Sequence, residues 1–97
     1  MEERLYLINL YDYYGELLTD KQRDYFEEYY FNNLSLAEIS ENYDISRNAI
    51  HKQLKDVEGK LLHYESILSL YHKKQKIELL LNTIDDVNLK EKIKELI

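Results

Sequence analysis

Apolar residues recur along this chain with the spacing of helix faces rather than of strands. Near the start, Leu7, Leu10, Tyr11 and Tyr14 fall at i, i+3, i+4 and i+7, which predicts a helix over residues 3–14. Gly15 follows. We expect it to close this helix in the left-handed conformation, which glycine adopts without a steric penalty.

A second helix is predicted between two polar boundaries. Thr19 and Gln22 have the spacing of a capping box, in which each side chain accepts a hydrogen bond from the backbone of the other residue. Asn32 and Asn33 end the segment. Its apolar face is a stripe of aromatic residues: Tyr25, Phe26, Tyr29 and Tyr30.

The next segment has the pattern of a helix-turn-helix over residues 35–55. Ser35 and Glu38 form a second capping box, which opens a short helix that we expect to end near residue 40. Residues 42–44 have the composition of a tight turn, because Asn and Asp tolerate a positive φ. Ile45 is predicted to be buried after the turn, and Ser46 to cap the following helix.

That following helix carries an unbroken heptad pattern. A straight helix over residues 47–84 would be about 57 Å long, far longer than one small domain can cover. We therefore expect it either to break, at Gly59 or near residues 72–76, or to project and pair with a second chain. Residues 85–88 then form a turn, and Asn88 with Glu91 is expected to cap a last short helix. The heptad positions are Ile50, Leu54, Val57, Leu61, Tyr64, Leu68 and Tyr71.

Composition narrows the fold to an all-α protein. The 97 residues include no Pro and only two Gly, which favours helices. The absence of Cys excludes disulfides, a thiol nucleophile and Cys-ligated metals. We expect a helical bundle with a central helix-turn-helix at residues 1–62 and a long C-terminal helical arm at residues 63–97 that forms a homodimer. Intramolecular packing of the heptad face is the open alternative. Without a long apolar run or a basic leader, the chain is expected to be cytoplasmic and not inserted in a membrane.

The charge is divided unevenly along the chain. Residues 1–45 contain three Lys or Arg and eleven Asp or Glu, whereas residues 46–97 contain ten and eight. An acidic total disfavours sequence-independent coating of nucleic acid, since neutralising phosphates supplies most of that affinity. It leaves room for a local basic surface that begins near residue 46.

The candidate binding residues lie on the exposed side of the second helix of the motif. Arg can pair with guanine and Asn with adenine, lysines suit phosphates, and the helix N-terminus favours an anion. These residue types predict an interface with double-stranded DNA. The candidates are Ser46, Arg47, Asn48, His51, Lys52 and Lys55.

Several segments together resemble the bacterial YlxM family, and residues 35–54 are more distantly similar to region 4 of sigma factors. The resemblance implies an all-helical protein with a DNA-binding or regulatory role and a link to the signal recognition particle pathway. Ser40 and Asp44 depart from the usual Ala and turn Gly of the motif. The segments are Leu18-Thr19-x-Lys21-Gln22-Arg23-x-Tyr25, Tyr29-Tyr30, Leu34-Ser35-Leu36-x-Glu38-Ile39 and Ile45-Ser46-Arg47-x-Ala49-Ile50.

No arrangement of residues predicts catalysis, a cofactor, a metal or a small-molecule substrate. The three His, at positions 51, 63 and 72, do not have the i, i+4 spacing of a helical metal site. The ten Tyr stand among acidic residues, so we expect them to pack in the core rather than to stack on nucleic acid bases. Two hypotheses remain open: a dimeric DNA-binding regulator, and an adaptor that binds the signal recognition particle GTPase or its RNA through acidic or Tyr-rich surfaces.

Overall fold

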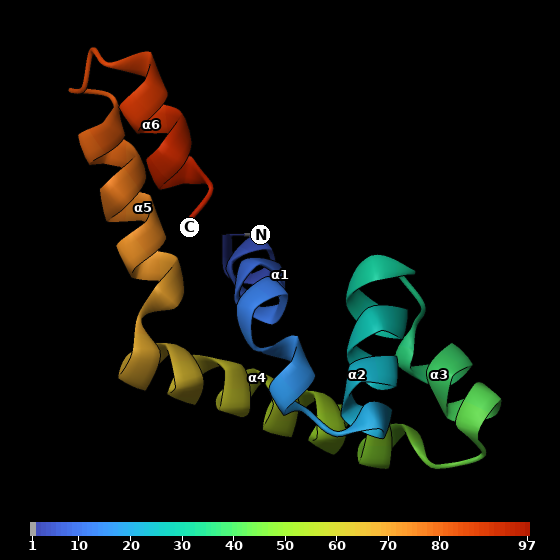
Figure 1. The fold of residues 1–97 in the computed structure, drawn as a ribbon. Helices are drawn as coiled ribbons and strands as arrows, with labels where there is room; N and C mark the ends of the chain where they lie inside the picture. The colour runs from blue at the N-terminus through green and yellow to red at the C-terminus, as the bar shows by residue number, and fades with distance from the viewer. Residues whose placement is uncertain (1) are drawn as a thin grey trace.

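The computed structural model describes residues 2–97, and this part of the chain contains helices and no strand, so the predicted all-α fold is confirmed (Figure 1). A 3-10 turn at Gly15–Leu17 follows α1, and a π-helical turn at Glu27–Phe31 continues α2. None of the helices in residues 2–97 combines the length and the hydrophobicity that crossing a membrane requires. The six helices are α1 (Glu2–Tyr14), α2 (Asp20–Phe26), α3 (Leu36–Tyr43), α4 (Arg47–Leu68), α5 (Leu70–Leu81) and α6 (Val87–Lys94).

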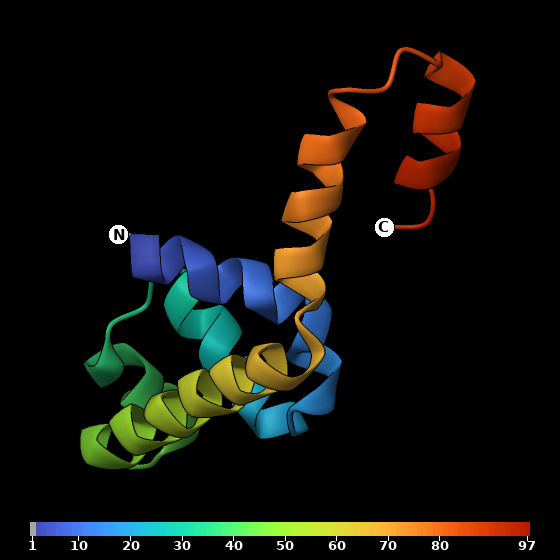
Figure 2. The same ribbon diagram turned by 90° about the vertical axis from the view of Figure 1, so that its left-hand side faces the viewer.

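The molecule has the shape of a bent rod. The helices α1, α2 and α3 pack on α4, whereas α5 and α6 form a hairpin that stands away from this body (Figures 1 and 2). The radius of gyration is 17.0 Å and the extents are 55 × 25 × 23 Å. A compact domain of about 100 residues has a radius of gyration near 13 Å, so the projecting hairpin accounts for the elongation. α4 runs through residues 62 and 63, and the division into two domains at that point stays a prediction.

The heptad face of α4 is buried largely within the same chain. Two clusters share it: Val57 and Leu61 pack against α1 and α2, while Ile50 and Leu54 pack against Ile39 of α3. Burying each such side chain contributes about 1.5–3 kcal/mol to folding. The intramolecular interpretation therefore holds for the first four heptad positions, whereas Leu68 is left exposed.

The predicted helix starts are confirmed at three places. Both capping boxes form, with Thr19 paired to Gln22 and Ser35 paired to Glu38. The Ser46 Oγ accepts a hydrogen bond from the backbone N–H of Ala49 at 3.1 Å, so Ser46 caps α4. These caps position both helices of the helix-turn-helix.

The prediction for Gly15 is wrong, because this residue begins the 3-10 turn and its φ is not positive. A Cβ at this position would lie 3.0 Å from Cε1 of Tyr11. The Tyr11 ring stacks on Phe26, with ring centroids 4.3 Å apart. Glycine is needed here for a close approach to an aromatic ring rather than for a left-handed backbone.

The first helix of the motif is longer than predicted. α3 continues through Asn42 and Tyr43, because the Tyr43 ring packs edge-on against Tyr25 at 5.0 Å. Asp44 alone takes the left-handed conformation, with a φ of 53°. Ile45 packs against the same cluster but is half-buried, not buried as expected.

The long helix breaks at Ser69 and not at Gly59, and the break lies three residues before the predicted stretch 72–76. Ser69 has a φ of 53°, and the direction of the chain changes sharply between α4 and α5 (Figure 1). Glu65 causes the break, because its buried carboxylate accepts hydrogen bonds from the backbone N–H groups of Tyr71 and His72. We call residues 65–72 the elbow.

The predicted cap of the last helix is also wrong. Asp86, not Asn88, caps α6, since its Oδ1 accepts a hydrogen bond from the backbone N–H of Leu89 at 3.1 Å. The cap therefore lies two residues earlier than predicted, and α6 begins at Val87.

Candidate nucleic-acid interface

The turn between α3 and α4 is closed by short-range bonds. The backbone N–H of Ile45 donates to the carbonyl oxygen of Ser40 at 3.2 Å, and the Ser40 hydroxyl donates to the carbonyl oxygen of Ile45. A Ser at position 40 therefore fastens the turn where the resembling families usually have Ala. The result is a helix-turn-helix whose second helix, α4, starts at the surface.

All six predicted binding residues are exposed, and all lie in the cap or the first nine residues of α4. Arg47 and Asn48 occupy the first turn, next to the capping residue Ser46. Among the described side chains, neither Arg47 nor Lys52 forms an ion pair within 4.0 Å. Their charges are thus available to a ligand.

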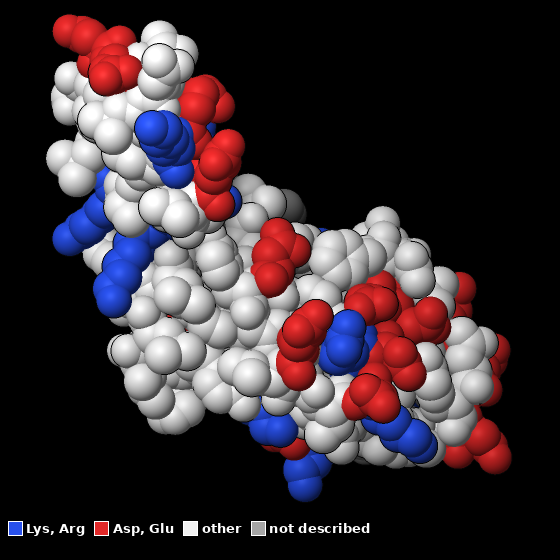
Figure 3. All heavy atoms as spheres, viewed as in Figure 1, with Lys and Arg blue, Asp and Glu red and all other residues white. Residues whose placement is uncertain are grey.

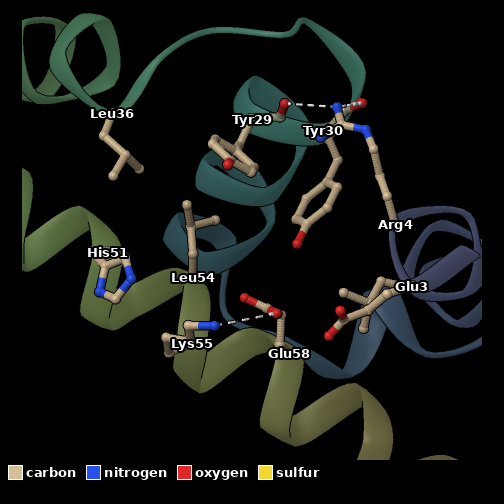
Figure 4. A pocket seen from close by; sticks show the side chains of 10 residues that line it. Glu3, Arg4, Tyr29, Tyr30, Leu36, His51, Leu54, Lys55 and Glu58 are labelled. Atoms are coloured by element: carbon tan, nitrogen blue, oxygen red, sulfur yellow. Dashed lines mark hydrogen bonds and ion pairs between the residues drawn. The ribbon is translucent and has the colours of Figure 1, made fainter. Parts of the chain in front are cut away.

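The structure divides the candidate binding residues on α4 into two groups. His51 and Lys55 line a hollow of about 280 Å³ between α4, α3 and the start of α1 (Figure 4). Arg47, Asn48 and Lys52 do not line it. Sequence reasoning placed all of these residues on one continuous face and did not predict the hollow, whose other walls include Tyr29, Tyr30 and Leu36.

Acidic side chains weaken the basic character of the hollow. Glu3 and Glu58 also line it, and the Lys55 Nζ lies 4.0 Å from a Glu58 carboxylate oxygen. A pair of this kind is worth little in water, but it offsets part of the charge that Lys55 would offer to a phosphate. The surface formed by Arg47, Asn48 and Lys52 is therefore better suited to a phosphate than the hollow is.

Arg4 is a positioning residue that sequence reasoning missed. Its Nη2 donates to the carbonyl oxygens of Tyr29 and Tyr30, at 3.1 and 2.8 Å (Figure 4). It also donates to Oδ1 of Asn33 at 2.9 Å. The guanidinium group also lies 4.8 Å from the centroid of the Tyr30 ring. Arg4 thus fastens the end of the π-helical turn to α1 and fixes the approach to α3. No local pattern could reveal this, since the partners lie at least 25 residues away.

An acidic surface covers α2, the π-helical turn that continues it, and α3 (Figure 3). The pKa of Glu38 is lowered by the hydrogen bonds from Ser35, so this capping carboxylate stays charged. The surface would repel phosphates, so α2 and α3 are unsuited to contact with the DNA backbone. Its acidic residues include Asp20, Asp24, Glu27, Glu28, Glu38 and Glu41.

The tyrosines serve mainly to pack the body. Tyr14, Tyr25 and Tyr30 are buried, and Phe26 stacks on Tyr30 with ring centroids 4.3 Å apart. Burial, together with the hydrogen bond to Glu65, raises the pKa of Tyr14 to about 12. Burial and the nearby charge of Glu58 likewise raise the pKa of Tyr30 to about 12. These tyrosines therefore do not form an exposed surface on which nucleic acid bases could stack.

A family model described as "Putative helix-turn-helix protein, YlxM / p13 like", also named UPF0122, matches residues 1–97. The chain belongs to this family. The resemblance seen in the sequence is thereby confirmed. The family description names a helix-turn-helix, and in this structure α3, the turn at residues 44–46 and α4 have that arrangement.

Relatives within the UPF0122 family come from several bacteria. A UPF0122 protein of Ureaplasma parvum serovar 3 is 45% identical over 94 residues, which cover 97% of this chain and 95% of the relative. One from Caldanaerobacter subterraneus subsp. tengcongensis is 50% identical over 76 residues, or 78% of this chain and 65% of the relative. One from Geobacillus sp. strain WCH70 is 41% identical over 91 residues, or 94% and 83%. The match thus spans 65% of one relative's length and nearly the whole of another's.

Proposed function

We propose that this chain is a cytoplasmic, non-enzymatic regulatory protein that binds double-stranded DNA through the start of α4. The observation that supports this most is the exposed group Arg47, Asn48 and Lys52, which has no ion-pair partner among the described side chains and follows the turn of a helix-turn-helix. In such motifs the N-terminal residues of the second helix meet base edges in the major groove.

Each residue has a distinct part in the proposed contact. Arg47 and Asn48 lie near base edges, where guanine and adenine offer bidentate partners. The first N–H groups of α4, around the cap at Ser46, attract a phosphate. Lys52 contacts the backbone directly, Lys55 does so against the pull of Glu58, and His51 lies at the edge of the base-reading surface.

The overall charge makes this a specific interface rather than a general one. With a net charge of −6, the chain gains little from long-range attraction to DNA. Affinity must therefore come from a few contacts at short range. We expect a shallow salt dependence, with a slope that reflects few phosphates.

Binding of a duplex, recovered from fragmented genomic DNA of the source organism, is the test for these roles. Arg47→Ala should cost about 1–3 kcal/mol of binding free energy and relax the preference for the recovered sequence. Lys52→Ala should weaken binding to all sequences and flatten the salt dependence. Fluorescence anisotropy at several salt concentrations measures both effects.

Lys21→Ala is the matched control, because it removes an equal charge from an exposed position on α2. It should leave sequence preference intact and affinity nearly so. If Arg47→Ala and Lys52→Ala bind like the unaltered chain, then the start of α4 is not the DNA interface.

One observation favours a second candidate function. The acidic surface over α2 and α3 is suited to a basic protein partner, which supports an adaptor that binds the signal recognition particle GTPase without binding DNA. The same surface would repel the phosphates of the particle's RNA. Co-purification with the GTPase that survives Arg47→Glu, but is lost when Glu27 and Glu28 are both replaced by Lys, supports the adaptor. The reverse pattern supports the DNA regulator.

A further inference from the structure

The hairpin of α5 and α6 has almost no core of its own. Leu81 is the one buried residue among residues 70–97. α5 contacts α1 and α4 near the elbow, and the rest of the hairpin extends beyond the body (Figures 1 and 2). Several large apolar residues of the hairpin have exposed fractions of 43–84%: Leu70, Leu79, Leu80, Val87, Leu89 and Leu96.

A hairpin of this size needs a covering surface to be stable. Its helices have 12 and 8 residues, and isolated helices of such lengths are marginal in water. Packing of an apolar face supplies most of the stability of protein helices. The exposed apolar residues of α5 and α6 have no such partner within the described chain. The occupant must therefore be apolar and must also match the charges of the hairpin.

Charge favours a second copy of the chain. Residues 70–97 carry six Lys and five Asp or Glu, so the hairpin is nearly neutral, whereas the rest of the chain carries seven Lys or Arg and fourteen Asp or Glu. Two bodies repel each other, and two hairpins do not. The hairpin is thus the part of the surface on which two identical chains can meet.

The charges along the hairpin also select an orientation. Lys73, Lys74 and Lys76 lie near the elbow, while Asp85 and Asp86 lie at the free tip, where Figure 3 shows acidic side chains. Two hairpins side by side and antiparallel place each acidic tip against the basic end of the other. The same arrangement brings the apolar residues of each tip against those near the elbow of the second copy.

We propose that two copies of this chain associate through their α5–α6 hairpins in an antiparallel, two-fold symmetric four-helix bundle. Such bundles are a common solution for pairs of helical hairpins, and two-fold interfaces are self-complementary in this way. The heptad face of α4, mostly buried within the chain, is not the interface. The proposal does not depend on DNA binding.

Sedimentation equilibrium of the full chain over a wide range of concentrations tests the proposal. The unaltered chain should sediment as a dimer of the 11.8 kDa monomer. Leu80→Glu should raise the dimer dissociation constant more than about tenfold, since it places a charge in a buried interface. Leu5→Glu is the control, because Leu5 is equally exposed but lies on α1, outside the hairpin. It should leave the dimer intact.

A charge exchange keeps the test decisive if Leu80→Glu disturbs the hairpin itself. Lys73→Glu alone should weaken the dimer, and adding Asp85→Lys should restore it, with helix content from circular dichroism unchanged throughout. A monomeric unaltered chain, a dimer untouched by Leu80→Glu, or a charge exchange that fails to restore association would overturn the proposal.

Discussion

Asp44 shows how one residue serves the fold and opposes the proposed function. It holds the turn between α3 and α4 in the left-handed conformation, at a φ of 53° and a ψ of 46°. Asp tolerates this conformation better than most residues, but its carboxylate stands close to the helix that would face phosphates. The position therefore separates backbone geometry from charge.

Replacing Asp44 by Asn should strengthen DNA binding severalfold. Asn tolerates the same backbone conformation, so stability should change by less than about 0.5 kcal/mol. Removing a negative charge beside the phosphate path raises affinity, and the gain should shrink as salt is added. Anisotropy titrations at two salt concentrations, with urea unfolding alongside, measure both quantities.

Asp44→Gly separates the effect of the charge from that of the rest of the side chain at the same site. Both variants should gain affinity equally, because both lose the charge. A gain in Asp44→Gly alone would mean that the side chain, not its charge, limits binding.

Local rules predicted the residues whose partners are close in sequence. The capping boxes at Thr19 and Ser35 and the cap at Ser46 follow from spacings of three residues. The prediction for Gly15 is wrong because glycine is needed there to make room for the ring of Tyr11, one turn earlier. A glycine after a helical stretch looks the same in the sequence whether it avoids a side chain or ends the helix. The role of Arg4 depends on contacts across the fold and had no sequence signal.

At the scale of elements, the elbow is the main feature that the sequence did not reveal. α5 begins with three N–H groups that have side-chain partners: Leu70 donates to the Tyr14 hydroxyl, and Tyr71 and His72 donate to Glu65. The Tyr14 hydroxyl in turn donates to Glu65 at 2.6 Å. Tyr14 and Glu65 are 51 residues apart, so no window of local sequence contains both.

Replacing Glu65 by Ala should loosen the elbow and destabilise the chain. It leaves the Tyr14 hydroxyl and two backbone N–H groups without their acceptor, at a cost of roughly 1–3 kcal/mol. The helix propensity across residues 47–81 then favours one continuous helix. In that state, spin labels at Lys52→Cys and Glu78→Cys would move towards a separation of about 39 Å along the axis.

The absence of native Cys permits this labelling, and dilution with unlabelled chains removes distances between copies. Tyr14→Phe is the companion variant, since it keeps the buried ring and removes only the hydroxyl. It should show a smaller effect in the same direction. Urea unfolding and label distances that match those of the unaltered chain in both variants would show that these bonds do not hold the elbow.

At the scale of the whole molecule, the buried tyrosines set the stability at high pH. The pKa values of Tyr14 and Tyr30 are raised to about 12 in the fold, above the ordinary value of 10.0. Their contribution to stability is complete below pH 10. Above it the unfolded phenols ionise while the folded ones keep their protons, so the contribution is lost as the pH approaches 12.

We therefore expect the free energy of unfolding to fall between pH 10 and 12, by on the order of 1–2 kcal/mol for each buried phenol. Urea unfolding at fixed protein concentration, with tyrosinate absorbance recorded in parallel, follows this loss. Tyr30→Phe should reduce the slope. A stability that stays constant up to pH 12 would contradict the burial of these hydroxyl groups.

The fold and the role proposed for the molecule differ in how far the sequence alone could reach them. The all-α class and the helix-turn-helix followed from helical periodicity and caps, which are local properties. The bent shape follows from the break at Ser69, beside which the Glu65 carboxylate accepts hydrogen bonds from Tyr14 of α1 and from the first turn of α5. The candidate residues on α4 were found from their chemistry, but their division between the open face and the acid-lined hollow required the structure.

The most direct test of the central claim is a binding selection of the purified, folded chain on fragmented genomic DNA from its own organism at physiological salt. The account predicts that recovered fragments share a sequence motif, which Arg47→Ala fails to enrich. Recovery of no motif above background from protein with native helix content would contradict it, and would assign the helix-turn-helix to contacts with another protein or with RNA.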